Sequence, residues 1–463
     1  MSRRTARPVF VLKPLVIGLL ALHGPAVLAE EVPTAAPVVT PVVAPVAAQT
    51  PAQAQAQSQA TATESTVLEP VEVESAAADE ALPQVSSPKY TAPLRDTPQS
   101  VQVIPKRIIE EQGQLTLRDM LGNVPGITLG AAEGGNGFGD NITLRGARIE
   151  NDIQVDGIRD SAQTARVDPF NLEQLEITKG ASSVYSGGGA VAGAINMVSK
   201  TAKKDEFVKL GAGVGTDNYY RATVDANTML GDTTALRVNV MTHENDTPDR
   251  DHVWAKRWGI ATSLAFGLGT DTRFSLNYLH QDNERVPDRG ILWRRASNPG
   301  VGAPVPVDRS TYFGWSNTDR ETAVIDTLTA LLEKDINDSL SLRNATRFAK
   351  TENYSNSATM NGLVCIGGVP FNATGTCPTA GDTFSISTNI GNVRDDETAI
   401  LANVTDLTWN FSTGGVGHTL VTGLSVSVED FERTSRQPRN LDGSAFTPAD
   451  DLVNRPVRDL HNP

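Results

Sequence analysis

Two cysteines, the side chains in this sequence best suited to covalent or metal chemistry, lie close together. Cys365 and Cys377 are the only cysteines, in a segment rich in Gly, Thr, Asn and Pro. A metal site would need further ligands nearby, and the six histidines are scattered without a His-x-x-His pairing. An isolated close pair favours a small disulfide loop in an oxidising compartment. The sequence therefore predicts a disulfide and no metal site.

Motifs for catalysis and nucleotide binding are weak or missing. Gly187–Gly189 and Gly211–Gly215 resemble pieces of a phosphate loop, but neither opens a helix and no Lys-Ser/Thr follows. The sequence contains no Gly-x-Ser-x-Gly elbow and no pattern of Ser, His and Asp that suggests hydrolysis. We therefore expect a protein that is not an enzyme and needs no cofactor.

The charge balance bears on the class of partner. The chain has 54 acidic and 40 basic side chains, a net charge of −14, and no dense run of positive charge. This composition argues against nucleic acid as the main partner. With 463 residues the chain is also too long for one compact core, so it should divide into two or three regions.

The N-terminus has the features of an export signal. Arg3, Arg4 and Arg7 precede an apolar stretch from Val9 to Leu22, and small residues follow where a signal peptidase would cut. We expect residues 1–29 to be a signal peptide that is removed. No later stretch reaches eighteen apolar residues, so a mature protein that enters a membrane would do so as strands.

Residues 30–88 predict a disordered tether. From Glu30 to Ser65 the composition is mostly Pro, Ala, Val, Gln and Thr, which cannot bury enough apolar surface to offset its ordering entropy. A short β-prone string follows, which could add as an edge strand to a partner's sheet. It reads Thr66-Val67-Leu68-Glu69-Pro70-Val71-Glu72-Val73. A solvated piece of linker has the same pattern, so periodicity alone leaves both interpretations open.

Residues 89–203 have the composition of a compact domain. A short helix is expected at Leu115–Leu121, before Pro125-Gly126. Strands are expected at Val101–Ile104, Asn141–Leu144, Ile153–Val155, Leu175–Thr178 and Ala194–Val198. These elements predict a small mixed α+β domain.

From residue 204 to 463 the chain alternates between apolar and polar side chains in segments of about ten to fourteen residues. Tyr220 and Val224 share one face of such a segment, and Arg221 and Asp225 share the other. In a soluble sandwich the apolar faces would meet each other. In an outer-membrane barrel they face lipid, and the polar faces line the lumen.

Connection lengths favour the barrel, because short turns alternate with mostly long loops, as periplasmic turns alternate with extracellular loops. The short turns are Gly231-Asp232, Gly269–Asp271, Asn337-Asp338 and Thr413–Gly417, and the long loops are His243–Val253, Asn283–Arg320 and Asn353–Asp396. About nine strands are expected, whereas a lumen that holds a domain needs about 22. We therefore expect an all-β membrane fold, an antiparallel transmembrane barrel of which residues 204–463 are the N-terminal, truncated part.

An ordered set of motifs over residues 96–200 closely resembles the plug domain of TonB-dependent siderophore receptors. Its first half comprises Asp96-Thr97-Pro98-Gln99-Ser100-Val101, Val124-Pro125-Gly126-Ile127, Leu144-Arg145-Gly146 and Val155-Asp156-Gly157. Its second half comprises Asn171-Leu172-Glu173-Gln174-Leu175-Glu176, Lys179-Gly180, Tyr185-Ser186-Gly187 and Gly193-Ala194-Ile195-Asn196-Met197-Val198-Ser199-Lys200. Within that family the chain looks most like the catecholate siderophore receptors.

The resemblance implies an α+β plug in the lumen of the barrel and a function in active transport. The string Thr66–Val73 would be the TonB box, with Pro70 departing from the commoner form and leaving its register open. It would pair in the periplasm with TonB of the inner-membrane TonB-ExbB-ExbD complex. The other partners would be a ferric siderophore and outer-membrane lipid, with iron carried only as the chelate.

Ligand in this family sits where upper plug loops meet extracellular barrel loops. A ferric tris-catecholate is a trianion with aromatic faces, so its site needs cationic donors and rings. The candidates are the cations Arg148, Arg159 and Arg166, the ring of Phe138, and the neutral donors Asn136 and Gln163. Each arginine could instead be solvated or pair with Asp152, Asp160 or Asp168. Arg145 is expected to brace the plug through ion pairs to barrel carboxylates.

The sequence thus predicts a ferric siderophore importer in the outer membrane of a Gram-negative bacterium, energised through TonB. Import of haem or cobalamin is the alternative within the class, and the lack of paired histidines argues mildly against haem. An adhesin or a phage and colicin docking protein is the alternative from another class. The TonB box would distinguish it, because a passive surface protein has no use for TonB.

Overall fold

The computed structural model describes most of the chain beyond residue 83. The described residues are 84–130, 141–149, 153–160, 168–182, 185, 191–288, 290–291, 304, 307–314, 316, 319–357, 364–366, 369–370, 383–385, 393–436 and 457–459. Among them, no helix is both long enough and apolar enough to span a membrane.

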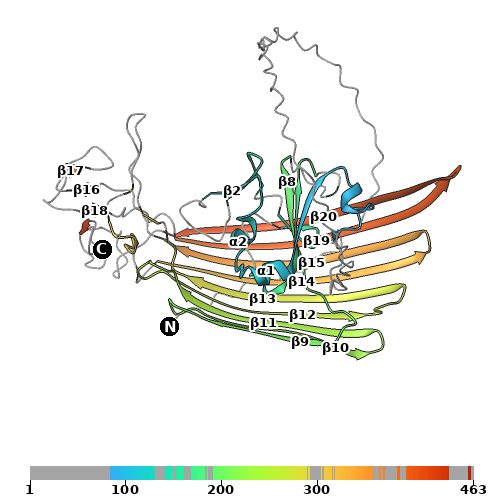
Figure 1. Cartoon of the computed structure of the whole chain (residues 1–463), viewed down its shortest axis with the longest axis horizontal. Coiled ribbons are helices and arrows are strands. Elements are labelled where there is room, and N and C mark those ends of the chain that lie inside the picture. Colours follow the sequence, from blue (N-terminus) through green and yellow to red (C-terminus); the bar gives the residue numbers. More distant parts are fainter. Residues whose placement is uncertain are drawn as a thin grey trace, which may run out of the picture. The chain divides into compact units, whose positions relative to one another are not determined.

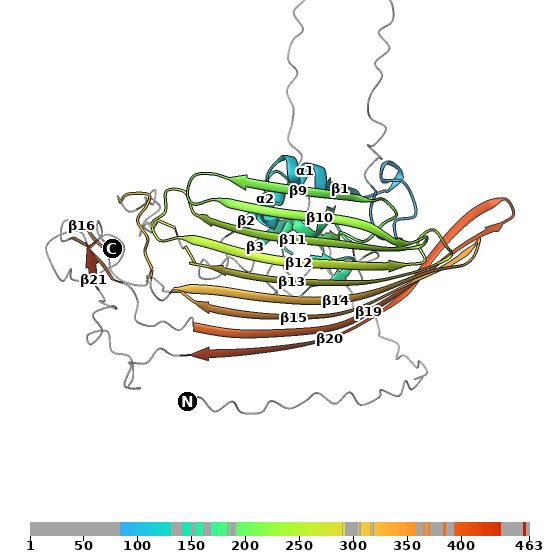
Figure 2. The same cartoon turned by 90° about the horizontal axis from the view of Figure 1, so that it is seen from below.

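The C-terminal half is built on one antiparallel sheet of nine long strands, which we call the wall (Figures 1 and 2). The order of the strands follows the chain, from β9 at one edge to β20 at the other. They are β9 (Phe207–Val214), β10 (Tyr220–Gly231), β11 (Thr234–Asp246), β12 (Trp254–Phe266), β13 (Thr272–Arg285), β14 (Arg320–Asn337), β15 (Leu340–Asn356), β19 (Val393–Thr413) and β20 (Val416–Arg436). This is the number of strands that the sequence predicts.

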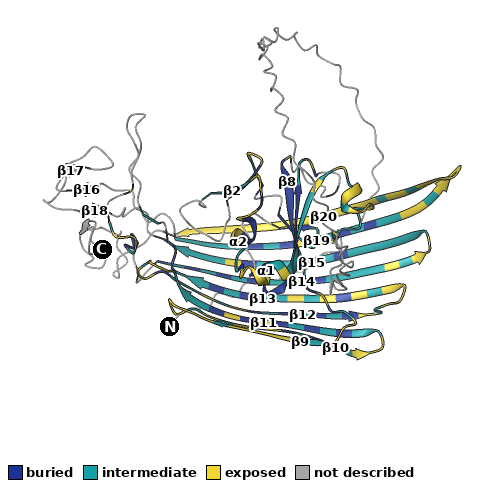
Figure 3. Cartoon of the chain, viewed as in Figure 1, coloured by how far each residue is buried: buried dark blue, intermediate teal, exposed yellow. Residues whose placement is uncertain are grey.

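Side chains along the wall alternate between two faces, and Figure 3 shows the alternation as bands of burial. On β10 and β11, Asp225 and Arg237 are buried, whereas Val224 and Val240 are exposed on the other face. Exposed apolar residues and buried charges invert the pattern of a soluble protein. A strand whose outer face meets lipid and whose inner face meets a polar interior has this arrangement.

Turn chemistry sets the connections between wall strands. Residues 232–233, 267–271, 338–339 and 414–415 form the four short turns, where Gly267, Gly269, Gly414 and Gly415 adopt positive φ. The connections at the other end span residues 215–219, 247–253, 286–319 and 357–392. The expected long loop His243–Val253 is shorter than predicted, because β11 continues to Asp246 and pairs there with Trp254.

A compact N-terminal domain, residues 94–199, lies against one face of the wall (Figures 1 and 2). Its helices are a 3₁₀ turn at Leu94–Asp96, α1 (Lys106–Glu111), α2 (Leu117–Leu121) and a second 3₁₀ turn at Pro169–Asn171. Its strands are β1 (Ser100–Pro105), β2 (Ile127–Gly130), β3 (Asn141–Leu144), β4 (Ala147–Arg148), β5 (Ile153–Val155), β6 (Ile158–Arg159), β7 (Leu172–Lys179) and β8 (Gly193–Ser199). The sequence predicted α2 with an earlier start and did not predict α1.

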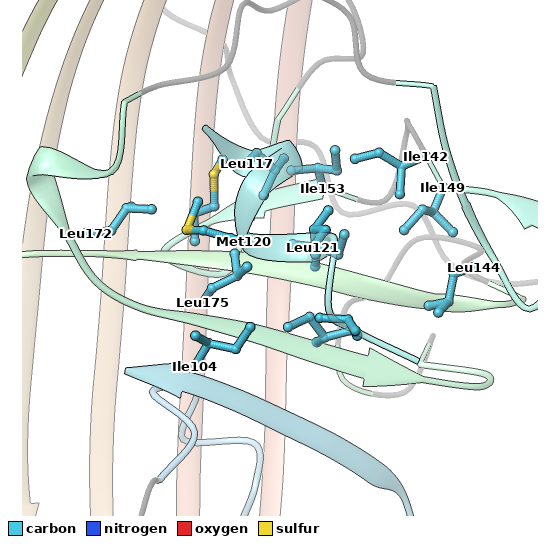
Figure 4. Close-up of a cluster of buried hydrophobic side chains, with 14 of the residues drawn as sticks. Ile104, Leu117, Met120, Leu121, Ile142, Leu144, Ile149, Ile153, Leu172 and Leu175 are labelled. Atoms are coloured by element: carbon cyan, nitrogen blue, oxygen red, sulfur yellow. The ribbon is translucent and has the colours of Figure 1, made fainter. Parts of the chain in front are cut away.

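Two small sheets build the domain. One has the order β1-β7-β8-β5-β6 and the other β2-β3-β4. Leu117, Met120 and Leu121 of α2 pack over Leu175 and Ile153 of the first sheet, and each of these five side chains is at most 1% exposed (Figure 4). Thr116 caps α2, since its side chain accepts a hydrogen bond from the Asp119 N–H at 3.1 Å.

Two of the sequence motifs that carry the family resemblance form tight hairpin turns. Arg145-Gly146 joins β3 to β4 with φ of 50° and 85°, and Asp156-Gly157 joins β5 to β6 with φ of 54° and 78°. Positive φ at both central residues defines the turn that suits two-residue hairpins, and glycine at the second position adopts it without strain. The two turns therefore carry Arg145 and Asp156 at defined points on the domain surface.

A short sheet combines three strands of the last long connection of the wall with one strand that follows β20 in the chain. It has the order β17-β16-β18-β21, with β16 (Val364–Ile366), β17 (Val369–Pro370), β18 (Thr383–Ser385) and β21 (Val457–Asp459). Cys365 on β16 is disulfide-bonded and 1% exposed. The predicted partner, Cys377, lies outside the described residues.

Candidate functional site

The contact between the N-terminal domain and the wall is the candidate site, and a buried carboxylate begins it. Asp168 starts the 3₁₀ turn Pro169–Asn171, where its side chain accepts from the Phe170 N–H. The same side chain is 0% exposed and binds Arg221 of β10 through two hydrogen bonds of 2.6 and 3.1 Å. Arg257 of β12 lies 3.4 Å away. One domain carboxylate thus holds two wall arginines.

A second ionic cluster lies on β10 and β11, closer to the short turn that joins them. Arg237, only 1% exposed, binds Asp225 through two hydrogen bonds of 2.8 Å and reaches Glu173 of the domain at 3.3 Å. Lys200 lies 3.1 Å from Asp225 and donates to the Phe170 carbonyl at 2.7 Å. Charged groups of the domain and of the wall share partners in this cluster, so removing one charged side chain leaves others buried without a counter-charge.

Burial also affects the neighbouring lysine of the domain. Lys106 lies 3.6 Å from Glu173. Burial lowers the pKa of Lys106, and the nearby Glu173 carboxylate opposes part of this shift. Glu173 therefore favours the charged form of Lys106 as well as the ion pair with Arg237.

An aromatic side chain fills a notch in the same part of the wall. Phe170 packs with Met241 and Ala261, and it lies directly over Gly259 of β12. A Cβ at position 259 would stand 2.9 Å from the Phe170 ring, closer than carbon atoms approach each other. The wall therefore has glycine where the domain inserts its ring. We call the contacts of Asp168, Glu173, Phe170 and Lys200 with β10–β12 the clamped side.

The opposite part of the wall makes fewer contacts. Arg347 of β15 donates to Asp156 at 2.6 Å and to the Val155 carbonyl at 2.7 Å. Asp156 also accepts from the N–H and hydroxyl of Ser199, so the Asp156-Gly157 turn is held from two directions. Ile158 of β6 also packs here with Ala345, Ile400, Ala402 and Val404 of the wall, so one ion pair and one apolar contact join the domain to this part of the wall.

Two cavities flank that ion pair. One of about 200 Å³ lies between β7 and β8 of the domain and β13–β15 and β19 of the wall, and another of about 60 Å³ lies mainly against β12–β15. Four residues line both, namely Asp156, Ser199, Asn277 and Thr329. Among the described residues Asn277 Oδ1 is buried without a hydrogen-bond partner, which suits a water-filled space. We call this part of the interface the cavity side.

Comparison with known proteins identifies this arrangement. A family model, the TonB-dependent receptor plug domain, matches residues 93–194. The catecholate siderophore receptor Fiu of Escherichia coli K12 is 38% identical over 359 residues, which are 75% of this chain and 46% of Fiu. The chain belongs to the TonB-dependent receptors. Its N-terminal domain is the plug, and the family consists of receptors and transporters.

Further relatives agree with this assignment. The probable TonB-dependent siderophore receptor PiuA of Acinetobacter baumannii is 42% identical over 272 residues, 58% of this chain and 36% of PiuA. The crystal structure of PiuA superposes with a TM-score of 0.71 at 33% identity, over 83% of this chain and 53% of that one. The open form of Fiu gives a TM-score of 0.67 at 34% identity, over 82% and 54%. The chain spans about half the length, or less, of these relatives.

The structure describes two of the six ligand candidates in this TonB-dependent receptor. Arg148 is exposed on β4, opposite Thr143. Arg159 is exposed on β6 and lines the smaller cavity together with Asp160 and Thr351. Asn136, Phe138, Gln163 and Arg166 lie outside the described residues, as does the expected TonB box Thr66–Val73.

Arg145 does not brace the plug as predicted. Its side chain is exposed and lies against Gly126 and Gly180 of the plug itself, and within the described residues no ion pair joins it to a wall carboxylate. The tight turn points Arg145 along the plug surface. On the clamped side and at Asp156 the polarity is mostly the reverse of that expected, because wall arginines reach plug carboxylates.

Sequence reasoning missed the residues that hold the plug, although a signal for them was present. Arg221, Arg237 and Asp225 lie on the polar, lumen-facing side of the period-two pattern, and Glu173 and Asp156 lie inside the plug motifs. The pattern predicts that these side chains face the lumen. It contains no information on which plug carboxylate lies opposite each arginine.

Proposed function

We propose that this protein imports a ferric siderophore, of catecholate type, across the outer membrane of a Gram-negative bacterium. Fiu, whose name describes a catecholate siderophore receptor, is similar over three quarters of this chain. PiuA, described as a probable siderophore receptor, agrees on the class of ligand. The observation that carries the proposal is a plug held by buried ion pairs against a wall with an apolar outer face.

The import proposed here involves no bond-making by the protein. Ligand binds at the outer plug loops, and the plug rearranges. The string Thr66–Val73 then pairs with TonB of the TonB-ExbB-ExbD complex, which supplies the energy. Iron would arrive already chelated, so the import proposed here requires no metal ligand from the protein.

Arg148 and Arg159 are the first two candidates for ligand binding. Both stand at hairpin positions of the plug, so their guanidinium groups start from a defined backbone. Guanidinium groups bind anionic oxygens with charge-assisted hydrogen bonds. Arg159 also lines the smaller cavity, so its guanidinium group stands where a ligand would pass from the outer loops into the interface between plug and wall.

Ligand titration tests the proposal on the purified full-length receptor. Tryptophan fluorescence would be followed while ferric catecholate, ferric hydroxamate and haem are added separately. We expect saturable quenching by the catecholate alone, weakened in Arg148→Ala and Arg159→Ala. Arg107→Ala is the matched control, because this exposed arginine makes a local ion pair with Glu111.

The outcomes separate the alternatives. Tight binding of haem or hydroxamate without a response to catecholate would keep the transporter and reject the substrate. Binding of none of the three, together with normal growth on each as iron source in a deletion strain, would reject import and favour a passive surface protein.

A further inference from the structure

Residues 84–90 lie on the plug as turns and extended backbone, and we call them the N-terminal strip. Gln174 of β7 donates to the Gln84 carbonyl at 2.8 Å. The Ser86 N–H donates to Glu176 at 2.6 Å, and the Glu176 side chain is buried. The strip is thus held by single hydrogen bonds and has no strand pairing.

An aromatic contact fixes the end of the strip. The Tyr90 ring stacks on the Tyr185 ring with centroids 4.3 Å apart and planes 9° from parallel. The Tyr90 hydroxyl lies 3.0 Å from the Thr178 hydroxyl. Burial raises the pKa of Tyr90, so this hydroxyl is protonated at neutral pH. The strip therefore contacts β7 at Gln84, Ser86 and Tyr90.

One ion pair joins the strip to the wall. Lys89 lies 3.6 Å from Asp406 of β19, whose side chain is 4% exposed and also lies 3.9 Å from Arg343 of β15. Within the described residues this is the only polar contact between the strip and the wall. Ser86, Ser87, Lys89 and Tyr90 all line the larger cavity, so the strip forms one of its boundaries.

Two closures therefore bound the larger cavity. Arg343, beside the strip, and Arg347, which binds Asp156, are both on β15. They are four positions apart along the strand, a distance of about 13 Å. Between them the wall presents the small or apolar side chains of Leu331, Ala345 and Val404, against which Ile158 of the plug packs. The stretch of wall from one ionic closure to the other thus meets the plug through apolar contact and not through charged groups.

We propose that the path for the ligand opens on the cavity side, between the plug and β13–β15 and β19, with the N-terminal strip as the stopper of its inner end. This inference rests on the proposed import. The clamped side stays in contact and acts as the hinge.

The size of the cavities requires such a movement. Drug-sized ligands occupy about 300–1,000 Å³. The cavities of about 200 and 60 Å³ are too small for one until something moves. Tension applied before residue 84 reaches the strip ahead of β1, which pairs with β7 from Ser100 to Pro105. The strip consequently leaves first, and its departure widens the larger cavity.

A third cavity, of about 610 Å³, lies on the clamped side. It is lined by α1, β9 and β10 and also by Phe170, Lys200, Arg221 and Asp225. The buried ion pairs of the clamped side bound it, so a path through this cavity would require breaking them. Strand β9 is at the edge of the described sheet and pairs only with β10. The far boundary of this cavity is therefore not part of the wall described.

Cysteine labelling in cells tests which side opens. Ala345→Cys on the cavity side and Ala261→Cys on the clamped side are matched, since the alanines are 1% and 3% exposed. Both lie five residues from the short-turn end of their strand, Leu340 and Phe266 respectively. A small fluorescent maleimide would be applied with and without ferric catecholate, in cells with and without TonB. We expect at least fivefold faster labelling of Ala345→Cys during energised uptake and no change at Ala261→Cys.

Other outcomes overturn the inference. Equal acceleration at both positions would mean that the whole plug leaves, and acceleration at Ala261→Cys alone would place the path on the other side. Active uptake without labelling at either position would also contradict the proposed path. Labelling of Ala402→Cys, a second buried alanine on the cavity side, would check that result. Asp406→Asn should speed labelling of Ala345→Cys without TonB, because it releases Lys89. If the cysteine-bearing receptors, folded and exported, neither bind nor import the catecholate, the proposed function fails instead.

Discussion

The two sides of the plug are held in different ways. On the clamped side, Arg221, Arg237 and Arg257 make multiple contacts with buried carboxylates, and Phe170 fills a notch at Gly259. On the cavity side, Arg347 and Lys89 make separate ion pairs, and Ile158 packs on apolar wall residues beside the cavity. The cost of breaking a contact rises with burial and shared partners. The comparison shows that the wall can hold the plug firmly on one side while its contacts on the other side are easier to break.

Removing the clamp carboxylate should have the largest effect. Asp168→Ala leaves Arg221 and Arg257 buried without their shared partner, so we expect a loss of about 3–5 kcal/mol in stability of the plug contact. Denaturant unfolding of the purified receptor, read by limited proteolysis of the plug, measures this. Asp96→Ala is the control, because its pair with Arg95 is exposed. Equal midpoints for the two variants would remove the distinction between the sides.

Loss of the single ion pair on the other side should cost less. Arg347→Met leaves Asp156, whose side chain is 24% exposed and still accepts from Ser199, so we expect about 1–3 kcal/mol. Combining it with Asp156→Asn in a double-mutant cycle isolates the pair. A coupling energy as large as that of Asp168 with Arg221 would contradict the proposed asymmetry.

Filling the notch should push the plug away from the wall. In Gly259→Val the new side chain meets the Phe170 ring, so we expect about 1–3 kcal/mol of destabilisation from overpacking. Phe170→Ala should relieve part of this loss in the double variant. Thermal unfolding of the four proteins measures the effect. If Phe170→Ala lowers the stability of the Gly259→Val protein further, the clash with the Phe170 ring is not the cause of the destabilisation.

The strip should be the weakest contact. Lys89→Met removes an ion pair whose lysine is 25% exposed, and we expect at most about 1 kcal/mol from it. Proteolysis at residues 84–90 should nevertheless become faster while global unfolding stays unchanged. Lys179→Met is the control, a half-buried plug lysine that bonds only Gln102 within the described residues. Unchanged proteolysis of Lys89→Met would show that the ion pair does not hold the strip.

The fold was largely predictable because its signals are local. Alternation along β10–β12 predicted which side chains face the lumen, and the wall has nine strands as counted from the sequence. The motifs at Arg145-Gly146 and Asp156-Gly157 are turns that two residues determine almost alone. Helix α1 was missed because its six residues carry no cap and almost no periodicity.

The candidate site was less predictable. Arg145 was expected to brace the plug, but its turn directs it along the plug surface. Asp168 was considered as a possible partner of the candidate arginines, and it binds the wall arginines Arg221 and Arg257. Which groups pair depends on the position of the plug relative to the wall. Asp168 and Arg257 are far apart in the chain, so no local pattern relates them.

By itself the sequence determined the division into an α+β plug and an alternating wall, because turn residues and period-two burial act over a few neighbouring residues. Only the tertiary structure decided which side of the plug is held by clustered buried ion pairs and which by separate ones. That choice depends on ion pairs and packing between segments such as Phe170 and Gly259, or Lys89 and Asp406, whose contact energies exist only once the plug and the wall are brought together.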